Sequence, residues 1–110
     1  MGEYTLSERA KRDLCGIGDY TEKAWSEEQA VKYLRLLFAQ FRILSENPLA
    51  EKPYAHVKVG LHGCRCGRHI IFYRILSQHK IRIIRILHER MDYPRHLSGI
   101  KERNSSEKNK

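Results

Sequence analysis

The segment from His62 to His69 concentrates side chains of the types that bind metals. It carries two cysteines and two histidines, and thiolates and imidazoles are the ligands that zinc prefers. The spacing argues against a site, because Cys64 and Cys66 on a strand would point the same way, about 6–7 Å apart, and the two arginines of the segment would repel a cation. We therefore predict neither a metal site nor a disulfide between these two cysteines.

A second set of residues could in principle cleave RNA. Arg85, His88 and Tyr93 are of the types that transfer protons or stabilise developing charge. Lys58 or Arg65 could stabilise the phosphate. Such residues also cluster by chance in a segment so rich in arginine and histidine, and a cationic binding surface without catalysis is the favoured interpretation. The sequence holds no phosphate-binding, dinucleotide-binding or zinc-protease motif, and we predict no cofactor.

The charge is distributed unevenly along the chain. Residues 1–51 hold 7 basic and 9 acidic side chains, whereas residues 52–97 hold 10 basic and 2 acidic ones and all six histidines. Residues 98–110 add 4 basic and 2 acidic side chains. A positive half of this density indicates an acidic partner, which would be either nucleic acid or an acidic protein segment.

Length and composition indicate one small intracellular domain. The 110 residues are 41% hydrophobic and 31% charged, which suits a single modest core. No apolar run approaches the roughly 18–20 residues of a membrane-spanning helix, and the N-terminus does not resemble a secretory signal. Three cysteines, an odd number, are typical of a reducing compartment, so we expect a cytoplasmic protein.

Two amphipathic helices are predicted in the first half. Ser7 is a good N-cap, and apolar or small residues recur after it at helical spacing. Ser26, followed by two glutamates and Gln29, resembles a capping box, and Asn47-Pro48 ends the second stripe. Because almost no chain separates the two helices, they must form an antiparallel hairpin.

The second half changes to the period of strands. Strands are predicted over residues 56–61, 67–76 and 81–88, with 77–80 as a hairpin loop. A turn or one helical turn follows at 91–97, and the polar residues 98–110 are expected to be disordered. The predicted fold is α+β: a helical hairpin packed on one face of a small antiparallel sheet of three to four strands, with a short C-terminal helical turn, all within residues 1–97.

Both strands of the predicted 67–88 hairpin are apolar on each face. Strict alternation places Ile81, Ile83 and Leu87 on one side of the last strand and Ile84 and Ile86 on the other. The helical hairpin can cover only one face, so the second face is expected to expose an apolar strip edged by Arg74, Arg82 and Arg85. The alternative is that the C-terminal segment folds back over that face.

The motifs of both halves follow an order found in a known family. The first half contributes Tyr4-Thr5-Leu6-Ser7, Asp13-Leu14, Tyr20, Trp25, Gln29-Ala30 and Tyr33-Leu34. The second half contributes Gly67-Arg68-His69-Ile70-Ile71-Phe72-Tyr73-Arg74, Ile83 through Asp92, and Arg95-His96-Leu97. Over roughly residues 4–97 the chain resembles ParE-type toxins of the RelE/ParE superfamily.

The resemblance implies the toxin of a type II toxin–antitoxin system, a class linked to plasmid stabilization, with a ParD-like antitoxin as partner. ParE members are associated with inhibition of DNA gyrase by protein–protein binding, without catalysis, membrane contact or direct nucleic-acid binding of their own. RelE members cut messenger RNA on the ribosome, which is the alternative function. Candidate gyrase-binding residues are Arg85, His88, Arg90, Asp92 and Arg95. Candidate antitoxin-binding residues are Ile71, Tyr73, Ile75, Ile84 and Ile86.

Overall fold

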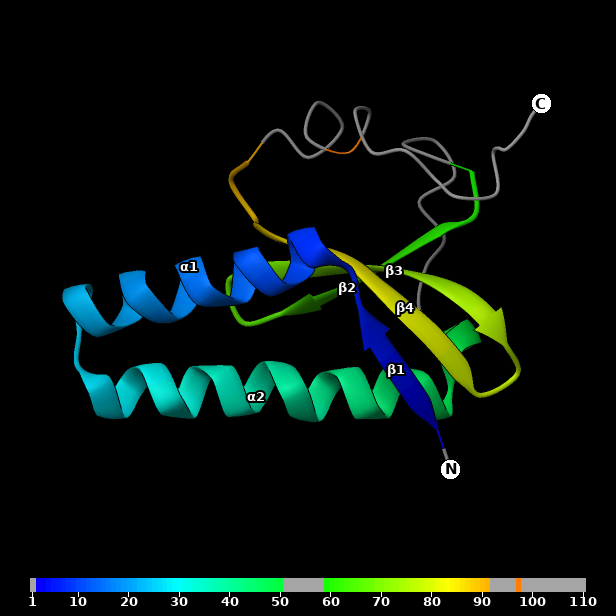
Figure 1. Cartoon of the computed structure of the whole chain (residues 1–110), viewed down its shortest axis with the longest axis horizontal. Coiled ribbons are helices and arrows are strands. Elements are labelled where there is room, and N and C mark those ends of the chain that lie inside the picture. The colour runs from blue at the N-terminus through cyan, green and yellow to red at the C-terminus, as the bar shows by residue number, and fades with distance from the viewer. Residues whose placement is uncertain (1, 51–58, 92–96, 98–110) are drawn as a thin grey trace.

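Two long helices lie side by side against one face of a four-stranded sheet in the computed structural model (Figure 1). The structure describes residues 2–50, 59–91 and 97. None of the helices among these residues is both long and apolar enough to cross a bilayer. The elements are β1 Glu3–Leu6, α1 Glu8–Ala24, α2 Glu27–Glu46, the short 3-10 helix η1 Pro48–Ala50, β2 Leu61–Cys66, β3 His69–Ser77 and β4 Lys80–His88.

The helices begin and end where the sequence predicts. The Ser7 hydroxyl accepts a hydrogen bond from the Ala10 N–H at 3.0 Å, and the Ser26 hydroxyl accepts one from the Gln29 N–H at 3.1 Å. Each such cap contributes about 1 kcal/mol. Asn47 is the C-cap of α2, directly before the proline. The predicted antiparallel hairpin is confirmed.

The sheet has the order β1-β4-β3-β2. Neighbours pair antiparallel except β1 and β4, which run parallel from Glu3 opposite Lys80 to Leu6 opposite Ile83. The α+β fold class is confirmed, and the N-terminal strand makes the sheet mixed. The strand predicted at 56–61 is displaced: β2 starts at Leu61, after a turn in which Gly60 has a φ of 81°. Residues 56–58 lie outside the described part of the chain.

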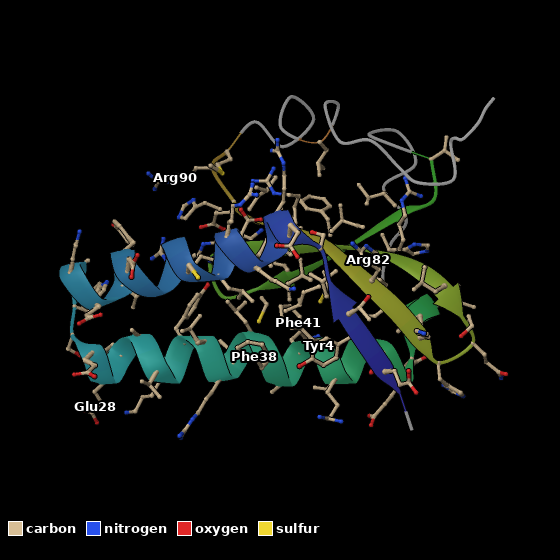
Figure 2. All side chains as sticks on the ribbon, in the orientation of Figure 1. Tyr4, Glu28, Phe38, Phe41, Arg82 and Arg90 are labelled. Atoms are coloured by element: carbon tan, nitrogen blue, oxygen red, sulfur yellow. The ribbon has the colours of Figure 1, made fainter. Side chains whose placement is uncertain are left out.

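The main core lies between the helices and the sheet. Leu37 and Phe41 of α2 and Ile71 and Tyr73 of β3 have no exposed surface. At the edge of this core Phe41 packs between Tyr4 and Phe38, with ring-centroid separations of 5.4 and 5.5 Å; Figure 2 shows the three rings between α2 and β1. The apolar stripes of the helices, and not their intrinsic propensity, therefore hold the layers together.

A β-bulge in β4 changes which residues share a face. Tyr73 pairs with Ile83 and Phe72 pairs with Arg85, so Ile84 is an extra residue in β4. Beyond the bulge the alternation is shifted by one. Ile86 joins the helix-side core, and Ile84 lies with Leu87 on the opposite face. Strict alternation therefore predicts the face of Ile84 correctly but is wrong after it, for Ile86 and Leu87.

The second face of the sheet is closed, and the predicted exposed strip is wrong. Its apolar side chains form a separate buried cluster, which we call the second-face cluster: Leu61, Ile70, Phe72, Ile84, Leu87 and Leu97. Leu97 has no exposed surface, which agrees with the alternative that the C-terminal segment covers this face. The helical turn predicted at 91–97 falls mostly on residues 92–96, outside the described chain, but Leu97 itself is helical.

The five candidate antitoxin-binding residues do not form one surface. Ile71, Tyr73 and Ile86 are buried against the helices, and Ile75 packs against the same core. Ile84 alone belongs to the second-face cluster. The expectation that the five side chains face outward together is therefore corrected, because it assumed an unbroken alternation and the wrong inner face.

Candidate functional site

Arg85 is held inside the protein. Its Nε and Nη2 donate to the two carboxylate oxygens of Asp13 on α1, at 2.8 and 3.0 Å, and its residue exposure is 8%. The same carboxylate accepts the Ile86 N–H at 2.9 Å, beyond the point where β1 stops pairing with β4. Arg85 therefore ties α1 to the sheet, and its predicted place on an exposed target-binding or catalytic surface is corrected. Bidentate, charge-assisted contacts of this kind are strong.

His88 and Arg90 lie together at the end of β4. The Arg90 N–H donates to His88 Nδ1 at 3.1 Å, and the Arg90 side chain is exposed. The His88 ring is half-buried and meets the His69 ring edge-on, with centroids 5.3 Å apart. The remaining predicted site residues, Asp92, Arg95, Tyr93 and Lys58, lie outside the described part of the chain.

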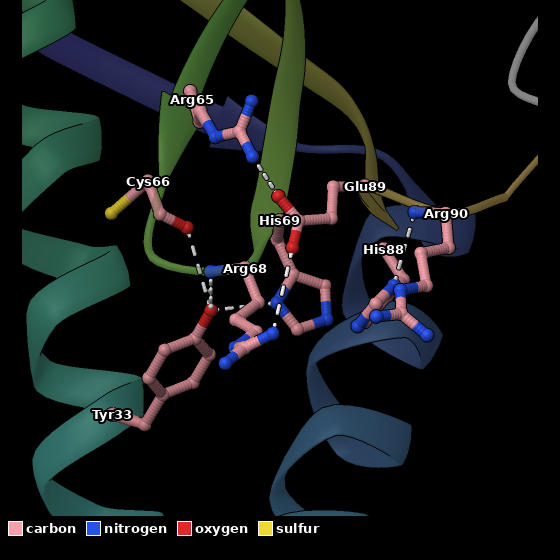
Figure 3. A network of polar contacts seen from close by, with 8 residues as sticks. All are labelled: Tyr33, Arg65, Cys66, Arg68, His69, His88, Glu89 and Arg90. Atoms are coloured by element: carbon pink, nitrogen blue, oxygen red, sulfur yellow. Dashed lines mark hydrogen bonds and ion pairs between the residues drawn. The ribbon is translucent and has the colours of Figure 1, made fainter.

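Tyr33 of α2 contacts Arg68 and His69, which lie next to His88, as Figure 3 shows. Tyr33 Oη accepts the Arg68 N–H at 2.9 Å and lies 2.7 Å from His69 Nδ1. Gly67, with a φ of 60°, leaves the room that this contact needs, because a Cβ there would lie 2.6 Å from the hydroxyl oxygen. Tyr33 thus fixes the two-residue turn Gly67-Arg68 between β2 and β3.

The sequence places Tyr33 in the second predicted helix and in a family motif, without a contact for its hydroxyl group. The signal that could have identified its second role is chemical. A tyrosine on a buried helix face needs a hydrogen-bond partner for its hydroxyl. The glycine turn at residue 67 is a place where a side chain can approach the backbone closely.

The His69 imidazole is neutral at physiological pH. Burial and, to a smaller extent, the charge of the neighbouring His88 lower the pKa of His69 to about 4, while Asp13 acts in the opposite direction. Burial also raises the pKa of Tyr33. Tyr33 and His69 therefore form a neutral hydrogen-bonded pair, which suits a positioning role and not proton transfer at neutral pH.

Glu89 connects the end of β4 to the β2–β3 turn. Its carboxylate forms ion pairs with Arg65 and, at 3.7 Å, with Arg68, while its N–H donates to the Arg68 carbonyl oxygen at 2.9 Å. The Glu89 side chain is 19% exposed, but those of Arg65 and Arg68 are 68% and 71% exposed. One carboxylate thus faces two guanidinium groups, and positive charge remains at the surface. We call the group Arg65, Arg68, His88, Glu89 and Arg90 the cationic end.

The cationic end is suited to binding and poorly suited to catalysis. Its carboxylate is engaged by two arginines, and Arg85, one of the predicted catalytic set, is paired with Asp13. Cys64 and Cys66 are buried on the helix side, where burial raises the pKa of the Cys66 thiol and Gln40 Nε2 lies 3.3 Å from Cys64 Sγ. Among the residues that the structure describes, no cluster of three or more metal-binding side chains occurs.

Comparison with known proteins identifies relatives across nearly the whole chain. The family model of the ParE toxin of the type II toxin–antitoxin system parDE matches residues 4–93. Toxin ParE1 of Caulobacter vibrioides is 39% identical over 97 residues, which cover 88% of this chain and 99% of that protein. Toxin ParE1 of Mycobacterium tuberculosis is 34% identical over 94 residues, covering 86% and 96%. Toxin ParE of Escherichia coli is 30% identical over 92 residues, covering 84% and 89%.

Solved structures show the same fold. A chain of the chromosomal ParDE toxin–antitoxin system from Pseudomonas aeruginosa superposes with a TM-score of 0.69 at 19% identity, covering 80% of this chain and 96% of that one. A chain of the RelBE2 toxin–antitoxin complex from Mycobacterium tuberculosis superposes with a TM-score of 0.54 at 25% identity, covering 79% and 96%. With its helical hairpin on a four-stranded sheet and its family match over residues 4–93, the chain belongs to the ParE toxins of type II toxin–antitoxin systems, within the RelE/ParE superfamily.

Proposed function

We propose that the protein is a cytoplasmic toxin that inhibits DNA gyrase by protein–protein binding and is neutralised by a ParD-like antitoxin. The observation that carries the proposal is the family match over residues 4–93, together with relatives named ParE toxins at 30–39% identity. ParE-type toxins are associated with gyrase inhibition by protein–protein binding. Plasmid stabilization would follow if toxin and antitoxin are encoded on a plasmid.

An acidic protein is the antitoxin that the charge distribution favours. Residues 52–97 carry 10 basic and 2 acidic side chains, and the two solved relatives described above come from toxin–antitoxin systems. Because the second-face cluster is buried, we infer that the antitoxin contacts the accessible arginines of this half, which include the exposed Arg65 and the half-exposed Arg82. Their attraction for an acidic segment speeds association and favours this partner over neutral ones.

The ribosome-dependent endoribonuclease is the weaker candidate. The catalytic set predicted for it includes Arg85, and the Arg85 guanidinium is bound to Asp13 within an 8% exposed residue. The half-buried His88 ring accepts a backbone hydrogen bond from Arg90 through its Nδ1. These contacts favour a structural role for Arg85 and a recognition role for the surface beside it.

A purified-component assay tests the proposal. The toxin is added to gyrase, ATP and relaxed plasmid, and in parallel to a reconstituted translation reaction with a labelled messenger RNA. We expect loss of supercoiling, restored by an equimolar ParD-like antitoxin, with the messenger RNA intact. Normal supercoiling together with cleavage of the messenger RNA would instead establish the endoribonuclease.

A further inference from the structure

The end of the helical hairpin projects beyond the sheet (Figure 1). The buried residues of α1 are Ala10, Leu14 and Ile17, and none of the seven residues that follow Ile17 in the helix is buried. This last part of α1 lies beside α2 (Figure 1), and Gly18 lets the two helices approach: a Cβ on Gly18 would lie 3.2 Å from Leu34 Cδ1. The extension therefore covers no part of the sheet.

Large apolar side chains are exposed on this projecting part. Trp25 and Tyr20 are 76% and 71% exposed, and Val31 in the second turn of α2 is 44% exposed. Tryptophan and tyrosine dominate the binding energy of protein interfaces and lose little conformational entropy when they are buried there. We call Tyr20, Trp25 and Val31, with the acidic residues around them, the hairpin tip.

The backbone of the hairpin tip is held rigidly. Both the Trp25 N–H and the Ser26 N–H donate to the Thr21 carbonyl oxygen, at 2.9 and 3.3 Å. The Ser26 hydroxyl then caps α2 through the Gln29 N–H. The exposed aromatics are thus presented on a pre-organised turn, which lowers the entropic cost of binding.

The charge of the hairpin tip is opposite to that of the cationic end. Residues 19–28 contain the carboxylates Asp19, Glu22, Glu27 and Glu28 and a single basic residue. Figure 2 shows Glu28 at the start of α2, pointing away from the sheet. Glu28 has one weak ion pair, with Lys32 at 4.0 Å, between largely exposed side chains, which contributes little. The tip therefore favours a basic partner surface.

A shallow hollow lies beside the tip. It measures about 450 Å³ and is lined by Glu27, Glu28, Val31, Lys32 and Arg35. Val31 gives an apolar surface on which a partner side chain can pack, between the carboxylates of Glu27 and Glu28 and the cationic groups of Lys32 and Arg35.

We propose that the hairpin tip docks on the target enzyme itself, at a basic protein surface of the kind that holds DNA. This inference rests on the proposed function, because an enzyme that passes DNA through itself must line its path with lysine and arginine. An acidic, aromatic surface is complementary to such a path, whereas the cationic end is not. The toxin then has two separate binding surfaces. The tip binds the target, in place of the target-binding role predicted from the sequence for His88 and Arg90, and the basic half binds the antitoxin.

The test compares tip variants with matched controls elsewhere on the surface. The tip variants are the double substitution Tyr20→Ser with Trp25→Ser and the charge reversal Glu22→Lys. The controls are Leu49→Ser, which replaces a side chain that is 79% exposed on η1, and Glu46→Lys at the far end of α2. Each protein is assayed for gyrase inhibition, for antitoxin affinity, and for mass by light scattering at low salt.

We expect the tip variants to need at least about tenfold more toxin for half-inhibition, which corresponds to the loss of one interface hot spot. Antitoxin affinity should change less than about threefold, and the controls should match the unmodified toxin. Unchanged inhibition by the tip variants, an equal loss of antitoxin binding, or a self-association that the tip variants abolish would each overturn the inference while leaving gyrase inhibition established. Failure of the unmodified toxin to inhibit gyrase would overturn the proposed function and the inference with it.

Discussion

The two faces of the four-stranded sheet are closed in different ways. On one face, two capped helices of 17 and 20 residues pack their apolar stripes against the strands. On the other, a smaller cluster closes around Leu97, which lies nine residues beyond the end of β4. The helix-side face depends on local periodicity, and the second face depends on one distant side chain and a bulge. We therefore expect the second face to be the weaker and more sequence-sensitive layer.

Deletions in β4 give the largest effect and test the bulge directly. Deleting Ile86 moves Leu87 to the helix side and His88 to the second face, and we expect loss of the native fold. Deleting Ile84 removes only the extra residue and restores regular pairing between Ile83 and Arg85 opposite Tyr73 and Phe72. That protein should still fold. Its free energy of unfolding should fall by about 2–5 kcal/mol, as it does for a buried Ile→Ala substitution. Amide NMR dispersion and urea unfolding distinguish the two; equal damage from both deletions would contradict this account of the bulge.

Truncations on the two faces should differ in cost. Phe41→Ala removes a fully buried ring between Tyr4 and Phe38 and should reduce the free energy of unfolding by about 4 kcal/mol. Leu97→Ala should reduce the free energy of unfolding by about 2 kcal/mol. The cost is smaller because the surrounding residues can move into the cavity more easily there than between the helices and the sheet. The midpoints of urea unfolding measure both. A larger loss from Leu97→Ala would mean that the second-face cluster dominates stability.

The ion pair that joins α1 to the sheet should have an intermediate effect. Asp13→Ala leaves the Arg85 guanidinium and the Ile86 N–H without their acceptor and should destabilise by about 3 kcal/mol. The double variant Asp13→Ala with Arg85→Met removes the stranded charge and should recover part of that loss. A double variant no more stable than Asp13→Ala would show that the buried charge is not the cause.

The smallest effect is a pH dependence from His69. Its folded pKa of about 4 lies below the ordinary 6.5, so the unfolded chain takes up the proton first, and stability falls as the pH drops from about 6.5 to 4. The slope is at most about 1.4 kcal/mol per pH unit, and solvent around this half-buried ring reduces it. His69→Gln should flatten this part of the profile. A profile unchanged by the substitution would assign the pH dependence to other groups.

The helical hairpin, its caps, the fold class and the family resemblance could all be predicted from the residues alone, because they depend on spacing within one segment. Ser7, Ser26 and Asn47-Pro48 define the helices through contacts with neighbouring residues. The presence of arginines beside the second face was also predictable, since Arg74 and Arg82 alternate with apolar residues before the bulge.

The packing of distant elements, in contrast, sets the face of the sheet on which each residue of β4 lies and the arginines that reach solvent. The bulge at Ile84 depends on pairing with β3, and the burial of Arg85 depends on Asp13, 72 residues away in the sequence. The contact of Tyr33 with the Gly67-Arg68 turn likewise joins elements distant in the chain. Such pairings arise when whole elements pack, so a pattern read within a single strand or helix cannot contain them.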